Sequence, residues 1–252
     1  MGEAIPYLTA EEIKKENKIK QLFQGYRGDS SEKLGLKIIN NLSSHLKKSK
    51  KEIRFLECGT GSGYFCLDMY NNGFTNIYGT DIDDYRNQEV IKQGIFKDFQ
   101  TLDLSWDKIP WTDNYFELLT AWCVLPHLEN PHNCIREAHR VLRPDGIFIL
   151  SMPHVNSIYA KKIFFKTGNL IRYTDNNNHI SVFTPHLFKK LILRYFDLLA
   201  VEYYINPGVY QGRFGSIKRM GIEKQWFGQQ KFKNWYGTNI IYVIKNKPKI
   251  SI

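Results

Sequence analysis

Three glycines at alternate positions follow a short apolar run, and they carry the strongest chemical signal in the chain. The segment reads Glu57-Cys58-Gly59-Thr60-Gly61-Ser62-Gly63-Tyr64. Glycine lets a backbone turn sharply, and it lets a ligand approach without a Cβ in the way. A carboxylate, Asp81, ends the next apolar run, where it can accept hydrogen bonds from both hydroxyls of a ribose. The spacing therefore predicts a binding site for a ligand that contains adenosine.

Position 64 distinguishes between two kinds of adenosine ligand. A dinucleotide fingerprint, Gly-x-Gly-x-x-Gly, would need glycine at this position so that a helix N-terminus could meet a pyrophosphate. The residue is Tyr64, and the pattern is Glu-x-Gly-x-Gly-x-Gly instead. Glu57 would lie where a positively charged amino group could be held nearby. The loop thus favours a zwitterionic ligand without phosphates.

Histidine is the side chain best suited to removing a proton near neutral pH. Three of the seven histidines follow segments expected to open at one edge of a sheet. We take His127 and His179 as the two main base candidates and His154 as the third. The alternative for each is a structural hydrogen bond that fixes a loop. The other four are expected on helix surfaces: His45, His132, His139 and His186.

The four cysteines show neither a Cys-x-x-Cys pair nor a zinc spacing: Cys58, Cys66, Cys123 and Cys134. Free thiols in a reducing compartment are expected, which favours a cytoplasmic location, and no metal site is expected. No apolar run approaches the roughly 18 residues needed to cross a bilayer. The polar N-terminus does not resemble a signal peptide.

The elements that must position these residues alternate between apolar runs and helical stretches. The apolar runs are 53–57, 76–81, 99–102, 116–122 and 146–152, and the helical stretches between them include 64–71, 85–93 and 131–142. This alternation predicts βαβ crossovers, and hence an α/β fold with a mostly parallel, Rossmann-like sheet and helices on both faces.

The flanking regions follow different patterns. Residues 1–50, with apolar stripes at helical spacing, predict an N-terminal helical cap before a main domain at 51–252. After Met152 the alternation stops. We expect insertions at about 155–180 and 206–237, and a helix over 184–199. Strands near 198–204 and 239–245 would bring the sheet to seven.

Taken in order, these segments resemble the class I S-adenosylmethionine-dependent methyltransferases, in the methyltransferase-11-like branch. The resemblance covers about 53–152. Besides the glycine loop it rests on four segments: Tyr78–Asp83, Leu102–Leu104, Phe116–Pro131 and Ile135–Gly146. One departure stands out. The family usually has Glu-His after the fourth strand, whereas this chain has Pro126-His127, so a carboxylate that could orient the histidine is missing.

The resemblance implies S-adenosylmethionine as the cofactor and assigns roles by position. Gly59, Thr60 and Gly61 would bracket the methionine part with Glu57 near its amino group, and Gly63 would allow close packing of the helix on the sheet. Asp81 would bind the ribose and Ile82 the adenine face. The remaining contacts would come from Asp103 and Leu104 at the adenine edge and from Ala121 and Trp122 at the methionine end.

The basic surplus concerns the methyl acceptor. The chain has 35 basic and 25 acidic residues, a formal charge of +10, and two clusters lie at 161–172 and 211–233. Both fall in the expected insertions, so the acceptor is predicted to be a small molecule, anionic or sugar-linked. O-methylation of a sugar or sugar-nucleotide is favoured. RNA methylation, a quinone-like lipid acceptor, and a catalytically silent partner subunit that binds the cofactor stay open as alternatives. The sequence makes no prediction of oligomeric state.

Overall fold

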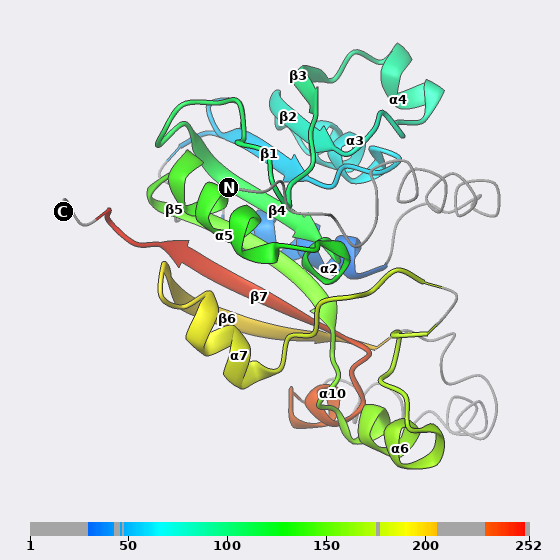
Figure 1. Ribbon diagram of the computed structural model, residues 1–252. Coiled ribbons are helices and arrows are strands. Elements are labelled where there is room, and N and C mark those ends of the chain that lie inside the picture. The colour runs from blue at the N-terminus through cyan, green and yellow to red at the C-terminus, as the bar shows by residue number, and fades with distance from the viewer. Residues whose placement is uncertain (1–29, 43–45, 47, 175–176, 206–229, 250–252) are drawn as a thin grey trace, which may run out of the picture.

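The computed structural model describes residues 30–42, 46, 48–174, 177–205 and 230–249. The strands are β1 Arg54–Cys58, β2 Asn76–Asp81, β3 Phe96–Thr101, β4 Phe116–Trp122, β5 Leu142–Pro153, β6 Phe196–Tyr204 and β7 Asn239–Asn246. They form one sheet in the order β3-β2-β1-β4-β5-β7-β6 (Figure 1). Among these described strands, β7 alone runs in the direction opposite to the other six. The predicted Rossmann-like, mostly parallel sheet is confirmed.

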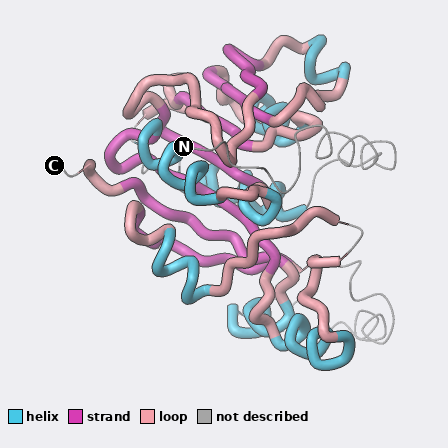
Figure 2. Tube along the Cα trace, viewed as in Figure 1, coloured by secondary structure: helices cyan, strands magenta, loops and turns pink. Residues whose placement is uncertain are grey.

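Helices cover both faces of this sheet, so that the strands form the middle layer (Figure 2). They are α2 Ser30–Leu42, α3 Tyr64–Asn71, α4 Gln88–Lys92, the 3₁₀ turn η2 Leu125–His127, α5 Pro131–Val141, α6 Ile158–Thr167, α7 Pro185–Leu191 and α10 Gln230–Tyr236. One buried cluster joins the sheet to α5 and α7, and a second joins it to α2, α3 and α4. Burial of both faces explains why β4 is apolar along most of its length.

The cap predicted at 1–50 is described only from residue 30 onward, apart from short gaps. Within it, Ile39 of α2 is 1% exposed and belongs to the same buried cluster as Ile53 and Phe55. Thus α2 packs on the sheet of the main domain. Among the described helices, none is long and apolar enough to span a membrane.

Four predicted boundaries differ from the structure by three residues or more. The strand expected at 99–102 begins at Phe96. The helix expected over 184–199 ends at Leu191, and β6 begins at Phe196, which is fully buried and pairs with Asn246 of β7. The helix expected over 85–93 starts only at Gln88, because the Asn87 side chain accepts a hydrogen bond from Glu89 and caps it. Strand β5 starts at Leu142, four residues before the expected start at 146.

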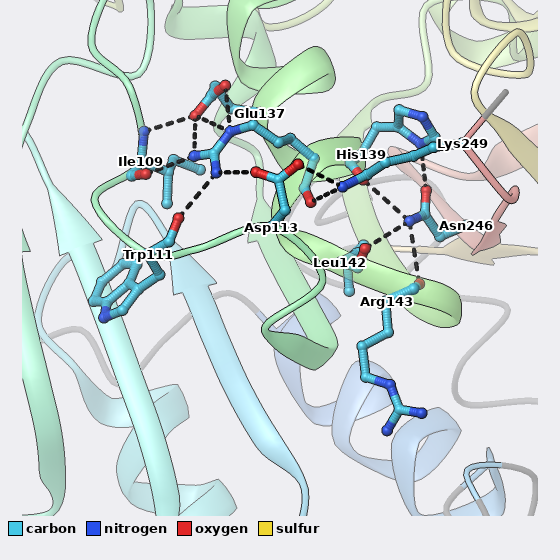
Figure 3. A network of polar contacts seen from close by, with 10 residues as sticks. Ile109, Trp111, Asp113, Glu137, His139, Leu142, Arg143, Asn246 and Lys249 are labelled. Carbon is cyan, nitrogen blue, oxygen red and sulfur yellow. Dashed lines mark hydrogen bonds and ion pairs between the residues drawn. The ribbon is translucent and has the colours of Figure 1, made fainter. Parts of the chain in front are cut away.

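A polar network at the amino-terminal edge of the parallel strands ties α5 to β7 (Figure 3). The Asn246 side-chain amide donates hydrogen bonds to the backbone carbonyls of His139, Leu142 and Arg143. His139 Nδ1 lies 2.6 Å from the Asn246 Oδ1. The expectation that His139 sits on a helix surface is therefore wrong. His132 and His186 are exposed, as expected, and His45 lies outside the described residues.

Candidate cofactor and acceptor site

The glycine loop runs from the carboxyl end of β1 into α3, and all three of its glycines, the last being Gly63 with a φ of 79°, adopt the left-handed conformation. The φ angles are 71° at Gly59 and 54° at Gly61, a region that costs an L side chain roughly 1–2 kcal/mol. A Cβ at Gly59 would lie 2.4 Å from Cγ2 of Val124, whereas a Cβ at Gly61 would have no heavy atom within 4 Å. The first glycine admits a neighbouring side chain, and the second borders open space that a ligand can fill.

Backbone contacts fasten this loop to the end of β2. The N–H groups of Gly59 and Thr60 both donate to the carbonyl oxygen of Thr80, at 2.8 and 3.0 Å. The Thr60 hydroxyl donates to the backbone oxygens of Glu57 and Thr80, so this side chain stabilises the loop. A Cβ at Gly63 would lie 2.9 Å from Val90 Cγ1, which accounts for this glycine by the packing of α3 against α4.

Asp81 ends β2 beside the same loop. Its Oδ2 accepts a hydrogen bond from the Gly61 N–H at 2.7 Å, and its Oδ1 accepts one from the Ile82 N–H at 2.8 Å. Burial raises the pKa of Asp81 to about 6, although these two hydrogen bonds act in the opposite direction. The carboxyl group is thus fixed in orientation and short of opposite charge.

Glu57 is the second carboxyl group beside the loop, and it is buried, with 2% exposed. The Cys66 thiol of α3 donates a hydrogen bond to its Oε2 at 2.9 Å. Burial raises the pKa of Glu57 well above its usual range, and the nearby carboxylates of Glu32 and Asp81 raise it further, while the thiol hydrogen bond opposes the shift. A cation bound here would offset that unfavourable environment.

The segment after β3 lies against Asp81, because the Leu102 N–H donates to the Asp81 carbonyl at 2.9 Å. The Asp103 Oδ1 accepts a hydrogen bond from the Ser105 N–H at 2.8 Å, and so it shapes the turn. Leu104 is 5% exposed and belongs to the core, whereas Ile82 is half-buried.

Ala121 and Trp122 end β4, and both are buried. Ala121 is aligned with Cys58 of β1. The Trp122 ring packs edge-on against Phe65 with centroids 5.0 Å apart, and it lies against Gly35 of α2. Its Nε1–H is buried and has no acceptor among the described residues.

These features fit S-adenosylmethionine, which carries an adenosine, an amino group and a sulfonium. Open space borders Gly61, and two carboxyl groups of raised pKa, the buried Glu57 and the half-buried Asp81, lie in the same loop region. Neither forms an ion pair with a described residue. The donor–acceptor set suits hydroxyl groups and a cation better than a pyrophosphate, as the sequence pattern predicts.

Two of the three base candidates lie together. The rings of His127 and His179 have centroids 4.4 Å apart, although the residues come from η2 and from the segment before α7. Cys123, directly after β4, joins them: its Sγ lies 3.7 Å from His179 Nε2. His179 is 8% exposed, and Cys123 and His127 are half-buried. Sequence reasoning assigned no role to Cys123.

Backbone hydrogen bonds hold this cluster together. The Pro126 carbonyl accepts from the N–H groups of Ile180 and Ser181, at 2.8 and 3.0 Å. The Ser181 hydroxyl donates to the Leu128 carbonyl at 2.8 Å. His127 Nδ1 lies 3.3 Å from the carbonyl oxygen of Asn178. The Asn178 carbonyl thus orients the imidazole of His127. In the family pattern, a glutamate at the position of Pro126 would offer a carboxylate for this role.

His154 has a different environment. Its Nε2 lies 2.9 Å from the backbone oxygen of Asn234 and 3.1 Å from the side-chain Oδ1, so this nitrogen donates to α10. Burial lowers the pKa of His154, although these hydrogen bonds oppose the shift. Figure 1 shows α10 beside α6. The contacts of His154 thus serve to anchor α10.

Comparison with protein families shows to which family the chain belongs. A model described as a methyltransferase domain matches residues 30–195, which is more than half of the sequence. The chain belongs to this methyltransferase family. The class predicted from the sequence, class I S-adenosylmethionine-dependent, is confirmed together with the fold.

The curated relatives of this chain are distant from it in sequence. Arginine-hydroxylase NDUFAF5, mitochondrial, of Rattus norvegicus is 26% identical over 174 residues, which cover 66% of the chain and 49% of the relative. The protein of the same name from Homo sapiens is 22% identical over 164 residues, covering 62% and 46%. The chain spans about half the length of the curated relatives it matches.

Solved structures share the fold. The [4+2]-cyclase SpnF superposes with a TM-score of 0.63 at 16% identity, covering 98% of this chain and 100% of that one. An S-adenosylmethionine-dependent methyltransferase from Mesorhizobium loti gives a TM-score of 0.53 at 15% identity, covering 81% and 97%.

Proposed function

We propose that this chain transfers a methyl group from S-adenosylmethionine to an oxygen atom of a small acceptor, such as a sugar or a sugar-nucleotide. The observation that supports this most directly is the pair of imidazoles, His127 and His179, whose rings lie 4.4 Å apart just beyond the end of β4. Val124, which contacts the glycine loop at Gly59, lies between Cys123 and η2 in the sequence. The pair is therefore connected to the cofactor loop by a short, well-packed segment.

The cofactor supplies an electrophilic methyl group on a sulfonium sulfur. In the overall reaction the acceptor oxygen forms a bond to the methyl carbon, the carbon–sulfur bond breaks with its electron pair on sulfur, and the hydroxyl proton is released. The chain contributes mainly alignment, because an in-line displacement depends on holding nucleophile and methyl group in position.

Residues of the chain divide these tasks. Asp81 accepts hydrogen bonds from ribose hydroxyls, and Glu57 balances the charge at the methionine end. Gly61 leaves room for the ligand. His127 and His179 promote the loss of the acceptor proton. His154 keeps α10 in place, as its hydrogen bonds to Asn234 suggest.

The acceptor class rests on charge and exposure. Lys161, Lys162 and Lys166 lie exposed on α6, which suits an anionic or sugar-linked molecule. Arg172 instead donates a hydrogen bond to the Asn239 side chain at 2.8 Å. Residues 211–229 of the second basic cluster lie outside the described part of the chain.

RNA methylation is the second candidate, favoured by the same lysines. The residues after β4 are Cys123-Val124-Leu125, and they lack the Asn/Asp-Pro-Pro-aromatic motif of amino-methylating nucleic-acid enzymes. None of the four cysteines follows a proline, as a cytosine-C5 nucleophile would. Ribose methylation therefore represents this candidate best.

The decisive assay supplies a labelled methyl donor with sugar, sugar-nucleotide and RNA acceptors. Transfer to a sugar oxygen is expected, and rates of His127→Ala and His179→Ala should fall more than about tenfold. His132→Ala, which changes an exposed histidine of α5, is the matched control and should retain its rate. If both site variants keep their rates, the proposed role of the pair fails.

Two further outcomes are informative. A protein that binds S-adenosylmethionine but methylates nothing would support the silent partner subunit instead. Since the curated relatives carry the name arginine-hydroxylase, the mass of the product should also be measured, because methylation and hydroxylation add different masses. None of the four cysteines forms a disulfide in the described part of the chain, in keeping with the proposed reducing, cytoplasmic compartment.

A further inference from the structure

Three side chains with metal-ligating atoms meet beyond the end of β4. The atoms that Cys123, His127 and His179 can offer all lie within 4.8 Å of one another. Thiolate and imidazole are the ligands that zinc and related divalent ions prefer. In sequence the ligands stand at positions 123, 127 and 179, a spacing unlike that of a zinc finger, so only the fold brings them together.

The distance between Cys123 and His179 suits a shared ion. A tetrahedral zinc with bonds of about 2.3 Å to sulfur and 2.0–2.1 Å to nitrogen places those two ligand atoms about 3.5 Å apart. Cys123 Sγ and His179 Nε2 are 3.7 Å apart. Little movement would be needed for both atoms to bind one ion.

His127 is oriented as a metal-bound histidine usually is. Its Nδ1 lies 3.3 Å from the Asn178 carbonyl oxygen. Because a carbonyl oxygen can only accept, Nδ1 carries the proton and the lone pair lies on Nε2. A metal-binding histidine typically donates its other ring N–H to such a carbonyl or to a carboxylate. The tautomer required of a ligand is thus already favoured.

The backbone around the cluster is firmly held. Cys123 adopts a φ of 56°, an uncommon conformation for a residue other than glycine. Its N–H donates to both the backbone oxygen and the hydroxyl of Ser151, each at 3.1 Å. On the opposite side, the Pro126 carbonyl fixes the segment that carries His179. Such preorganisation lowers the cost of gathering three ligands around one ion.

We propose that Cys123, His127 and His179 bind one divalent transition-metal ion, zinc being the best match, with a fourth position open to the acceptor. Three protein ligands and one open position are typical of catalytic zinc sites, whereas structural sites use four protein ligands. The partial exposure of Cys123 and His127 leaves a route to that position.

The site deepens the proposed function and rests on it for its chemical meaning. A bound Lewis acid lowers the pKa of a hydroxyl group that it contacts, so the acceptor loses its proton to solvent more readily. His127 and His179 then act as ligands, and the metal performs the activation expected of a free imidazole base.

Metal binding can be tested without any methyl-transfer assay. The full chain, without a histidine tag, is stripped with a chelator and titrated with Zn²⁺ by calorimetry and with Co²⁺ by absorption spectroscopy. One equivalent should bind, and Co²⁺ should produce intense visible bands of a four-coordinate site plus a thiolate charge-transfer band in the near ultraviolet. Cys123→Ser should abolish the charge-transfer band, since only this variant removes the thiolate ligand.

Removing a ligand should weaken Zn²⁺ affinity by more than the 10–100-fold typical of changing a residue that only hydrogen-bonds to a ligand. We therefore expect a loss of roughly hundredfold or more for Cys123→Ser, His127→Ala and His179→Ala. The control His132→Ala should bind as the wild type does. Circular dichroism checks that each variant folds, and His179→Gln provides a milder replacement if the alanine variant does not.

The outcomes separate this proposal from the proposed function. If the wild type binds no Zn²⁺, or binds it as tightly as the three variants do, the metal site is wrong even when methyl transfer is present. If Zn²⁺ binds with one equivalent and depends on all three residues, the site stands even when no acceptor is methylated.

Discussion

Asp81 accepts a backbone hydrogen bond at each carboxylate oxygen, from Gly61 and from Ile82, and still has a pKa of about 6 because of desolvation. Hydroxyl groups of a ribose need acceptor lone pairs, which protonation of the carboxyl would reduce. The same desolvation that raises the free energy of the charged carboxylate increases the strength of its hydrogen bonds to a ligand. At the scale of this residue, stability is given up for binding.

The pH dependence of cofactor binding follows from that pKa. A carboxyl whose pKa in the folded chain is raised from 3.8 to about 6 is half charged near pH 6 and becomes fully charged only well above it. Affinity for S-adenosylhomocysteine, which is the cofactor without its methyl group, should therefore rise with pH. For one titrating group the rise is about tenfold between about pH 5 and pH 7. Calorimetric titration across this range measures it.

Asp81→Asn serves as the control for this prediction, because an amide does not titrate. The variant should bind the ligand more weakly at neutral pH and show a flat profile. A variant that keeps the wild-type slope would assign the titration to another group, and the buried Glu57 would be the next to test.

At the scale of elements, Glu117 joins the strands at the edge opposite the site. Its carboxylate accepts hydrogen bonds from Lys48 at 2.8 Å, from the backbone and guanidinium of Arg54 of β1, and from Arg143 of β5 at 3.0 Å. These partners hold the pKa of Glu117 down, to about 2, against the effect of burial, which alone would raise it. One residue of β4 thus connects both neighbouring strands.

Glu117→Gln should lower the free energy of unfolding by about 2 kcal/mol at neutral pH, because a buried acceptor of three cations loses its charge while the cations stay partly exposed. The folded pKa is depressed from 4.5 to about 2, so the contribution is complete above 4.5 and is lost as pH falls toward 2. Urea unfolding at about pH 7 and pH 3 tests this. A difference between wild type and variant that stays constant with pH would contradict it.

Element boundaries show what the sequence can predict. The prediction for β2 and β4 agrees with the structure to the residue. The helix predicted at 184–199 runs into the first four residues of β6, since Leu191, Leu193, Phe196 and Leu198 fit either period over so short a stretch. Pairing with β7, which is distant in sequence, decides the outcome.

The site divides in the same way. Glu57 and Gly61 are neighbours in sequence, and Asp81 ends the next expected strand, so spacing and the family resemblance together predict that Asp81 lies beside the loop, as its hydrogen bond with Gly61 shows. The cluster of Cys123 with His127 and His179 could not be predicted in this way, because it forms through the Pro126 carbonyl and the backbone of Ile180 and Ser181. Backbone hydrogen bonds leave little trace in residue types. The sequence does mark this position as unusual, because Pro126 precedes His127 where the family pattern has glutamate.

At the scale of the whole molecule, the formal charge of +10 already counts every carboxylate, so what matters for the local field is which basic side chains are paired. Arg54, Arg86 and Arg140 each form an ion pair with a carboxylate, and Arg172 binds the Asn239 side chain. The exposed lysines of α6 remain as a local positive field. Such a field concentrates small anions near the molecule but makes few simultaneous contacts.

Salt dependence should therefore separate the two acceptor classes. RNA binding through 6–10 phosphate contacts would lose roughly 10³–10⁵ in affinity between about 50 and 200 mM salt, because counterions are released from the backbone. A sugar-nucleotide carries few charges, so the KM for the acceptor should change less than about tenfold over the same range. Steady-state kinetics at fixed, saturating S-adenosylmethionine measures this, and Lys162→Ala on α6 should flatten the remaining dependence. A steep loss for the preferred acceptor would instead indicate a polyanion bound across the basic surface, and would favour RNA over a small sugar-linked acceptor.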